Sequence, residues 1–247
     1  MHRLLVDTAL LSEEAPQLPA DAARHLRVVR PRPGEAVELF DGRGSWRVYG
    51  WNDGLRAQSN IRTIEQSNIS LTLFACVTKG SRWDWTVEKA TELGVTRIVP
   101  VISDRTIVRI PKPERAAKRE RWLRIAEDAA RQSDAKWLPE IVEPIDFADA
   151  LPLVRETTCF IGALTNPPSP PLAQALEHSN TRTFEHSNTR TFEHFSLSTF
   201  IGPEGDFTPE ELTALMEVAI PVSFGPTVLR AETAAIFALS VLSARLR

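Results

Sequence analysis

The chain has 247 residues, of which 43% are hydrophobic and 25% are charged. These proportions are those of an ordinary folded protein, and they exclude a disordered, collagen-like or coiled-coil chain. The 29 Lys and Arg residues against 32 Asp and Glu residues give a net charge of −3, so attraction to a polyanion must come from local basic clusters. No stretch approaches 18 consecutive apolar residues and the acidic N-terminal segment lacks a signal-peptide pattern, so we expect a cytoplasmic protein without a membrane span.

Residues 1–69 predict a small β-barrel that contains a cluster of basic residues. Short alternating runs of apolar residues are separated by Asp-Gly turn signals, and closely spaced strands joined by tight turns are typical of small barrels. The expected strands cover 35–40, 45–51 and 55–64, and one short helix is expected near 20–29. The segment between Asp21 and Glu35 contains no acid, and its basic residues are Arg24, His25, Arg27, Arg30 and Arg32.

From residue 70 onward the pattern changes to strands that alternate with helices. This alternation predicts a second domain over 70–247, built on a mostly parallel sheet with helices on both faces. The expected strands cover 71–78, 95–102, 157–164, 198–202 and 220–225. Helices are expected from a capping signature at Ser81 to Gly94, over 120–136, from Pro209 and near Glu232.

A perfect tandem octapeptide, EHSNTRTF, occupies 177–192. It places His178, His186 and His194 eight residues apart, so a metal site has to be considered. Because no Cys or carboxylate stands at ligand spacing, the pattern favours a polar surface insertion over 177–195 and no metal site. Cys76 and Cys159 each lie in an apolar run, and we expect both to be buried rather than bridged or reactive.

Two loops at the ends of predicted strands contain most of the candidate site. The first reads Ile-Gly-Pro-Glu-Gly-Asp-Phe over 201–207, and the second runs over 224–233. In open α/β sheets ligands bind beyond the carboxyl ends of strands, and glycine lets a ligand approach the backbone closely. The alternative is structural: Gly202 and Gly205 end a strand, and a Thr208-to-Glu211 capping box begins a helix.

Motifs for other chemistries are absent. The glycine patterns of P-loop and dinucleotide-binding proteins do not occur, nor does the G-x-S-x-G pattern of serine hydrolases. Basic residues are concentrated in a second segment, 105–124, where eight Lys or Arg face two Glu. Such a cluster is what a phosphate backbone requires, and the alternative is a solvated helix face that binds nothing.

The two loops together resemble the signature loops of RsmE-type methyltransferases of the SPOUT superfamily. The resemblance rests on I-G-P-E-G at 201–205 followed by F-G-P-x-V-L-R-A-E-T-A at 224–234. Further matches cover nearly the whole chain in order, at His25-Leu26, Val29-Arg30, Pro33-Gly34, 41–44, Lys79-Gly80, 88–95, Arg121-Trp122 and Gln132-Ser133. Each match is weak alone, but the combination is specific.

This resemblance implies an α/β protein in which an N-terminal PUA-like β-barrel grips RNA and a C-terminal SPOUT-type parallel-sheet domain contains a deep trefoil knot. It implies that S-adenosylmethionine is bound in the knot loops and carries the reactive methyl group. A homodimer through the knot domain is implied as well, with each active site near the subunit interface. The implied reaction is methylation of N3 of a specific uridine in the decoding region of 16S ribosomal RNA, within the small ribosomal subunit.

The resemblance and the chemistry of N3 also suggest residue roles. We expect Arg230 to stabilise the developing oxyanion or orient a phosphate, and Glu204 or Glu232 to accept the N3 proton. The expected cofactor-binding residues are Gly162, Leu164, Ile201, Gly202, Pro203, Glu204, Gly205, Phe224, Gly225, Val228, Leu229, Arg230, Glu232 and Thr233. The expected RNA-binding residues are Arg3, His25, Arg27, Arg30, Lys79, Arg82, Arg105 and Arg109.

The sequence departs from the family pattern in three places. Asp206 stands where a second small residue is expected, Ala231 replaces a Thr, and the residues 134–136 replace a Gly-rich or Arg-rich continuation. Two alternatives therefore stay open: a non-catalytic RNA-binding or ribosome-assembly factor with the same fold, and a knot methyltransferase that acts on transfer RNA.

Overall fold

The computed structural model describes residues 1–163, 167–185 and 195–246. The chain forms two compact units, the first made of Met1–Gln66 with Glu127–Leu138 and the second of Ser67–Ala126 with Pro139–Arg247. The sequence pattern places one boundary between residues 69 and 70. It gives no sign that a later segment, 127–138, belongs with the first unit.

The first unit is a five-stranded sheet with two short helices. β1 is parallel to β2, whereas β2 pairs antiparallel with β3, and β3 pairs with β4 and β5 along different parts of its length. The strands are β1 His2–Leu5, β2 Ala36–Phe40, β3 Ser45–Trp51, β4 Leu55–Ala57 and β5 Arg62–Thr63, and the helices are η1 Thr8–Ser12 and α1 Ala20–Val29. The predicted helix at 20–29 and the predicted strands at 35–40 and 45–51 are confirmed, whereas the predicted strand at 55–64 is wrong, because β4 and β5 occupy only its two parts. β1 and η1 were not expected.

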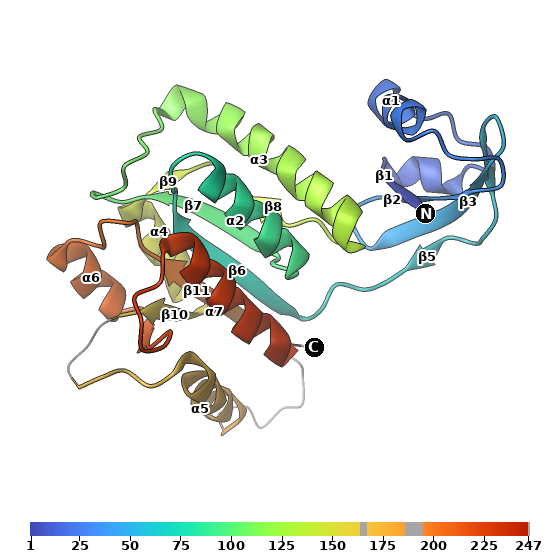
Figure 1. The fold of residues 1–247 in the computed structure, drawn as a ribbon. Helices are drawn as coiled ribbons and strands as arrows, with labels where there is room; N and C mark the ends of the chain where they lie inside the picture. Colours follow the sequence, from blue (N-terminus) through green and yellow to red (C-terminus); the bar gives the residue numbers. More distant parts are fainter. Residues whose placement is uncertain (164–166, 186–194, 247) are drawn as a thin grey trace. The chain divides into compact units, whose positions relative to one another are not determined.

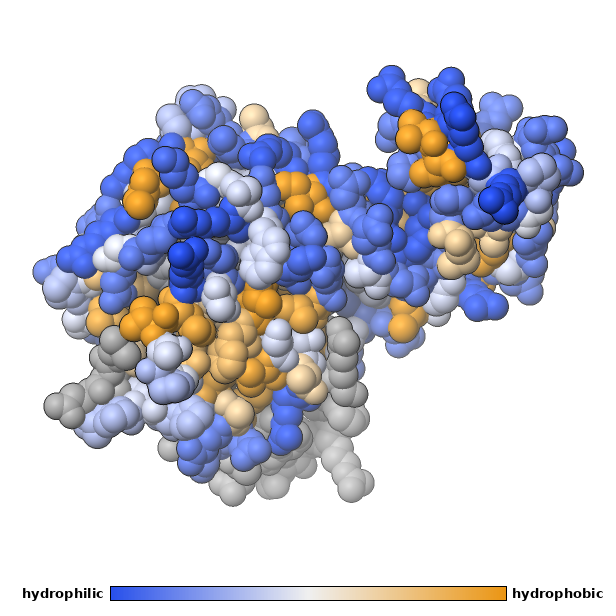
Figure 2. All heavy atoms as spheres, in the orientation of Figure 1, coloured by the Kyte–Doolittle hydropathy of each residue, from blue (hydrophilic) through white to orange (hydrophobic). Residues whose placement is uncertain are grey.

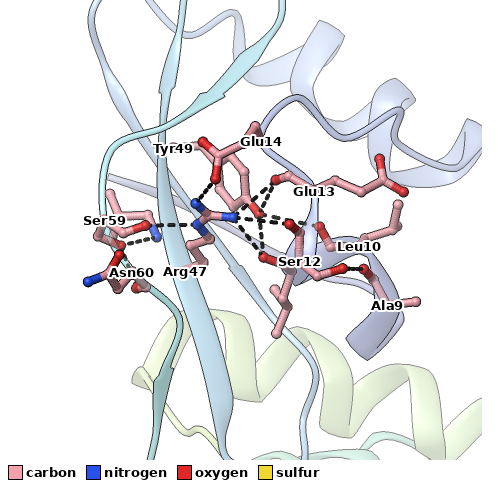
Figure 3. Close-up of polar contacts among 11 residues, drawn as sticks. Ala9, Leu10, Ser12, Glu13, Glu14, Arg47, Tyr49, Ser59 and Asn60 are labelled. Atoms are coloured by element: carbon pink, nitrogen blue, oxygen red, sulfur yellow. Dashed lines mark hydrogen bonds and ion pairs between the residues drawn. The ribbon is translucent and has the colours of Figure 1, made fainter.

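The buried side chain of Arg47 on β3 connects η1 and the loop after it to the sheet of the first unit (Figure 3). The Arg47 guanidinium donates to the carbonyls of Leu11 (3.1 Å) and Ser59 (2.8 Å) and pairs with the Glu14 carboxylate. The neighbouring Tyr49 hydroxyl donates to the carbonyl of Leu11 at 3.1 Å. Backbone carbonyls in this irregular segment lack sheet partners, so the side-chain donors satisfy them.

Arg3 on β1 is a second buried arginine, with 8% of its surface exposed. It donates to the Glu38 carboxylate at 2.8 Å, to the carbonyl of Ala130 at 2.5 Å and to that of Ala135 at 3.2 Å. Lys136 also donates to Glu38, at 2.6 Å. These contacts explain why the segment 127–138, distant in sequence, belongs to the first unit.

The second unit contains a parallel sheet of seven described strands in the order β12-β10-β11-β6-β7-β8, with β9 paired to β7 (Figure 1). The strands are β6 Ile69–Cys76, β7 Arg97–Ile102, β8 Glu140–Ile141, β9 Ile145–Asp146, β10 Thr158–Gly162, β11 Phe195–Ile201 and β12 Ile220–Val222. The helices are α2 Ser81–Glu92, α4 Phe147–Arg155, α5 Leu172–Glu185, α6 Pro209–Met216, α7 Ala231–Leu246 and the part of α3 (Lys112–Ser133) up to Ala126. The prediction of a parallel α/β sheet is confirmed.

Helices cover both faces of this sheet because side chains alternate along each strand. Leu71 and Leu73 of β6 point into a core shared with α2, α3, α5 and α7, whereas Phe74 and Cys76 point into a core shared with α4 and α6. In the second core, the rings of Phe74 and Phe200 are stacked with centroids 5.7 Å apart.

The structure corrects several predicted boundaries. The N-cap of α2 is Gly80, which has φ +66°, and Ser81 is already helical, so the expected Ser81 cap is wrong. α3 begins at Lys112, earlier than expected. α4 was not predicted, because it contains Pro152 and proline usually ends a helix. The capping box of Thr208 and Glu211 at the start of α6 is confirmed.

The tandem repeat is described only in part. Residues 177–185 continue α5 as a helix, and the polar surface insertion over 177–195 stays a prediction. The rest of the repeat, with His186 and His194, lies outside the described residues. Among the described residues, no group of three or more His, Cys, Asp or Glu side chains could hold a metal ion.

Cys76 and Cys159 are free and buried, which confirms their prediction. Desolvation raises the pKa of the Cys76 thiol to about 11 and that of the Cys159 thiol to about 12. None of the described helices is long and apolar enough to cross a membrane. The trefoil knot stays a prediction.

Candidate functional site

Four neighbouring parallel strands bring their carboxyl ends to one edge of the sheet. β12, β10, β11 and β6 are adjacent in that order and end at Val222, Gly162, Ile201 and Cys76. The loops that follow them therefore share this edge. Both predicted glycine loops are among these, as is the segment 77–80 that leads into α2, so the structure brings the candidate regions together.

Two of the predicted glycines are required by packing. A Cβ on Gly162 would lie 2.5 Å from a ring carbon of Phe224, and a Cβ on Gly202 would lie 2.9 Å from a ring carbon of Phe207. The Phe224 ring therefore joins the loop after β12 to the end of β10. Leu164, predicted beside Gly162, lies outside the described residues.

Gly205 differs from these two, because the fold leaves space for a side chain there. A Cβ on Gly205 would meet Arg105 Cβ at 3.5 Å, which is an ordinary contact. Neighbouring Asp206 has a left-handed backbone with φ +59°, and its carboxylate accepts a hydrogen bond from the Phe207 amide at 2.8 Å. Asp tolerates this conformation better than most residues, so it can occupy a position where a small residue is expected.

The second glycine loop, 224–230, joins β12 to α7. Gly225 has φ +120°, a conformation that side chains disfavour. Val228 is 88% exposed, whereas Leu229 packs against the core. Arg230 at the end of this loop is exposed and makes no ion pair with any described residue, so its guanidinium is available to a ligand.

One arginine contacts the first glycine loop and approaches the first turn of α7, which follows the second loop. Arg82, in the first turn of α2, donates from Nη1 to Glu204 Oε1 at 3.3 Å, and its Nε lies 3.9 Å from Glu232 Oε1. The second carboxylate oxygen of Glu232, Oε2, is buried and has no hydrogen-bond partner among the described residues. A buried acceptor without a partner is costly, so this oxygen is suited to a ligand that brings a donor. Sequence reasoning assigned Arg82 only an RNA contact and missed this bridge.

The eight predicted RNA-binding residues fall into different environments. Arg3 is buried and pairs with Glu38, which speaks against its predicted RNA contact. The Arg105 guanidinium donates to carbonyls of the first glycine loop, and the Arg109 guanidinium donates to carbonyls of its own loop. Of the eight residues, those that are exposed and make no ion pair with a described residue are His25, Arg27, Arg30, Lys79, Arg105 and Arg109.

The basic cluster on α3 is partly neutralised. Arg115 pairs with Asp146 at 2.5 Å, Arg121 pairs with Asp84, and Arg119 pairs with Glu120 at 3.1 Å. These ion pairs favour the alternative of a charged helix face over a continuous phosphate-binding surface along α3.

The fold and the site define a class of protein: an α/β domain with glycine loops at the carboxyl ends of adjacent parallel strands, joined to a smaller sheet domain. The chain matches the family described as RNA methyltransferase domain over residues 65–243, and the one described as RNA methyltransferase PUA domain over 18–49. The chain belongs to this RNA methyltransferase family.

Individual relatives agree with this assignment. The protein named ribosomal RNA small subunit methyltransferase E from Synechocystis sp. is 32% identical over 254 residues, which is 99% of this chain and 78% of that protein. The crystal structure of the protein of that name from Neisseria gonorrhoeae, bound to S-adenosyl methionine, has a TM-score of 0.79 and 28% identity and covers 99% of this chain and 98% of that one. A putative methyltransferase from Legionella pneumophila, in complex with the same cofactor, has a TM-score of 0.75 and 27% identity and covers 98% and 97%. The predicted family and two-part fold are confirmed.

Proposed function

We propose that this protein transfers a methyl group from S-adenosylmethionine to N3 of a uridine in the 16S ribosomal RNA of the small subunit. The observation that carries the proposal is the convergence of the two glycine loops on Arg82, which contacts Glu204 of one loop and lies 3.9 Å from Glu232, just beyond the other. The names of the relatives, ribosomal RNA small subunit methyltransferase E, support the class of RNA.

The residues present fit the cofactor. Gly205 leaves space that the fold itself does not need. Glycine at the carboxyl end of a strand lets an adenosine group approach the backbone. We assign its binding to the backbones of Gly202, Gly205, Gly225 and Leu229, and the cofactor supplies an electrophilic methyl group when bound.

The chain's own residues prepare the uracil. N3 carries a proton and is a poor nucleophile until that proton leaves, so a base and a stabilising cation are required. Glu232 accepts the proton on Oε2, the oxygen that has no partner among the described residues. Glu204 is the alternative acceptor, although its Oε1 already accepts from Arg82. The free guanidinium of Arg230 stabilises the negative charge that develops on the uracil oxygen.

The first unit contributes RNA affinity in this proposal. His25, Arg27 and Arg30 are exposed on or just after α1, and Lys79 is exposed beside the glycine loops of the second unit. Lys and Arg contacts to phosphates position an RNA, while a base removed from its stack gives specificity. Arg3 is left out of the set because it is buried.

We also propose the predicted homodimer. Apolar side chains gather over α7 and the loop before it (Figure 2), where Val228 is 88% and Phe237 is 39% exposed. Exposed apolar patches of this kind mark contact surfaces between proteins. The trefoil knot and the cytoplasmic location belong to the same proposal.

The decisive test is mapping of methylated nucleotides in ribosomal RNA with and without the gene product. The proposal expects one N3-methyluridine in 16S RNA to disappear when the gene is deleted and to return with the wild-type protein but not with Glu232→Gln. A lost modification in transfer RNA would instead support the second alternative. Calorimetry that finds no S-adenosylmethionine binding would support a non-catalytic RNA-binding factor.

A further inference from the structure

The loop that follows β7, residues 103–109, is held rigid by its own hydrogen bonds. The amide of Ser103 donates to Thr106 Oγ1 at 3.0 Å, and the two hydroxyl oxygens lie 2.9 Å apart. Both residues are buried, with 2% and 1% of their surfaces exposed. The Arg109 guanidinium donates to the carbonyls of Ser103 (3.2 Å) and Asp104 (2.5 Å). Because β7 is parallel to β6, this loop is a fixed support at the edge where the candidate site lies.

Glu211 joins this support to the end of the first glycine loop. One carboxylate oxygen accepts from the Thr208 amide at 3.0 Å, as the capping box requires. The other accepts from the amide of Asp104, 107 residues earlier in the chain, at 2.9 Å. Glu211 is only 7% exposed, and hydrogen bonds to a buried carboxylate are strong. The second bond serves no purpose in helix capping.

Arg105 makes the reciprocal connection. Its Nη1 donates to the carbonyls of Gly205 and Phe207, both at 3.2 Å. These two carbonyls flank Asp206, whose left-handed φ of +59° is the strained point of the loop. The guanidinium and the Glu211 carboxylate therefore hold the loop to the same support from two directions.

We infer that Arg105 and Glu211 are positioning residues that hold the 202–207 loop in its ligand-binding conformation before the ligand arrives. The inference rests on the proposed function for the identity of the ligand, S-adenosylmethionine. A loop with two glycines loses much conformational entropy when it is ordered, and a loop ordered in advance does not subtract that entropy from binding. Arg105 then acts on the cofactor through the loop and is not an RNA contact.

The test compares Arg105→Ala and Glu211→Gln with the wild-type protein. We expect the dissociation constant of S-adenosylmethionine, measured by calorimetry, to rise about tenfold or more, since ordering one loop segment costs about 1.4 kcal/mol or more, a factor of ten in affinity. The KM for S-adenosylmethionine rises likewise, while kcat at saturating cofactor and RNA stays within about twofold, because neither side chain touches the reacting atoms. Affinity within twofold of the wild-type value in both variants overturns the inference.

Two control variants separate positioning from simple loss of stability or charge. Thr208→Ala removes the helix cap but neither connection to the 103–109 loop, so it lowers the Tm without weakening cofactor binding. Arg155→Ala removes an exposed cation at the end of α4 and should change neither quantity. If Thr208→Ala weakens binding as much as Arg105→Ala at an equal loss of Tm, the inference is overturned.

A measurement without cofactor keeps the inference separate from the proposed function. In the free protein, the amides of 204–208 should exchange hydrogen about tenfold faster in Arg105→Ala than in the wild-type protein, whether or not either binds S-adenosylmethionine. Unchanged exchange would contradict the inference even in an active enzyme. Wild-type protein that binds no S-adenosylmethionine would contradict the proposed function alone. For Arg105→Ala, the slope of the logarithm of RNA affinity against the logarithm of salt concentration should match that of the wild-type protein. A slope reduced by about one would make Arg105 a phosphate contact instead.

Discussion

The two units of the protein use arginine in different ways. In the first, Arg3 and Arg47 are 8% and 7% exposed and donate to backbone carbonyls, while Arg3 also pairs with Glu38 and Asp134 and Arg47 with Glu14. In the second, Arg82 and Arg230 stand at the edge of the sheet, one between two carboxylates and the other exposed. Both buried arginines of the first unit bind irregular backbone, whereas in the second unit Arg230 is left exposed to a ligand.

The difference follows from how each unit satisfies the hydrogen bonds of its backbone carbonyls. The first unit has short strands and long irregular connections, whose carbonyls need donors from side chains. The second unit satisfies most of its carbonyls within a parallel sheet and helices. Arg105 and Arg109 still donate to loop carbonyls there, whereas Arg230 makes no ion pair with a described residue and is open to a ligand. Four predictions test this contrast.

The largest effect is expected for Arg230→Ala. Loss of a cation that stabilises the developing oxyanion should lower kcat about 100-fold. The Tm should stay unchanged, because Arg230 is exposed and makes no ion pair with the described residues. Single-turnover methyl transfer from radiolabelled cofactor measures the rate, and Arg230→Lys should recover part of it. A fall in Tm that accounts for the lost activity would refute the contrast.

Arg3→Ala should produce the opposite pattern. Removing one member of a buried charged group should cost about 3 kcal/mol of unfolding free energy in the first unit. Cofactor affinity should be unchanged, because Arg3 belongs to the first unit and the glycine loops to the second. Urea unfolding with hydrogen exchange resolves the two units, and Arg24→Ala is the exposed control. Normal stability of Arg3→Ala would show that the buried network is dispensable.

Two glycine substitutions distinguish residues of the first glycine loop that the fold requires from residues that leave space for a ligand. Gly205→Ala should leave the Tm unchanged, since its Cβ meets only Arg105 Cβ at 3.5 Å, yet weaken cofactor binding about tenfold by occupying ligand space. Gly202→Ala should lower the Tm as well, since its Cβ would lie 2.9 Å from the Phe207 ring. Calorimetry and thermal unfolding measure both variants. Unchanged cofactor affinity in Gly205→Ala would remove Gly205 from the proposed cofactor site.

The smallest effect concerns Asp206. Asp206→Val should cost about 1 kcal/mol, because a β-branched residue disfavours φ +59° and cannot accept from the Phe207 amide. Asp206→Gly should be nearly neutral, since glycine adopts this conformation freely while losing the side-chain bond. Equilibrium unfolding of the two variants distinguishes them. Equal stability of both would show that the backbone conformation at 206 is not constrained.

Much of the second unit could be predicted because its signals are local. Alternating apolar residues in β6 and the capping box at Thr208 depend on neighbours a few residues away. The helix α4 could not be predicted, because Pro152 stands inside it and tertiary packing of Val154 and Ala150 outweighs that local preference. The burial of Arg3 and the contacts of Arg105 could not be predicted, because a cation in a sequence does not reveal whether carbonyls surround it.

The sequence by itself determined the family, the parallel α/β sheet and the two glycine loops, because these depend on local periodicity and on short motifs. Only the tertiary structure decided which charges meet. Arg82 lies beside Glu204 and Glu232, and the Asp104 amide donates to Glu211, over separations of more than 100 residues. Such contacts arise when parallel strands end at one edge of a sheet, and no local pattern encodes them.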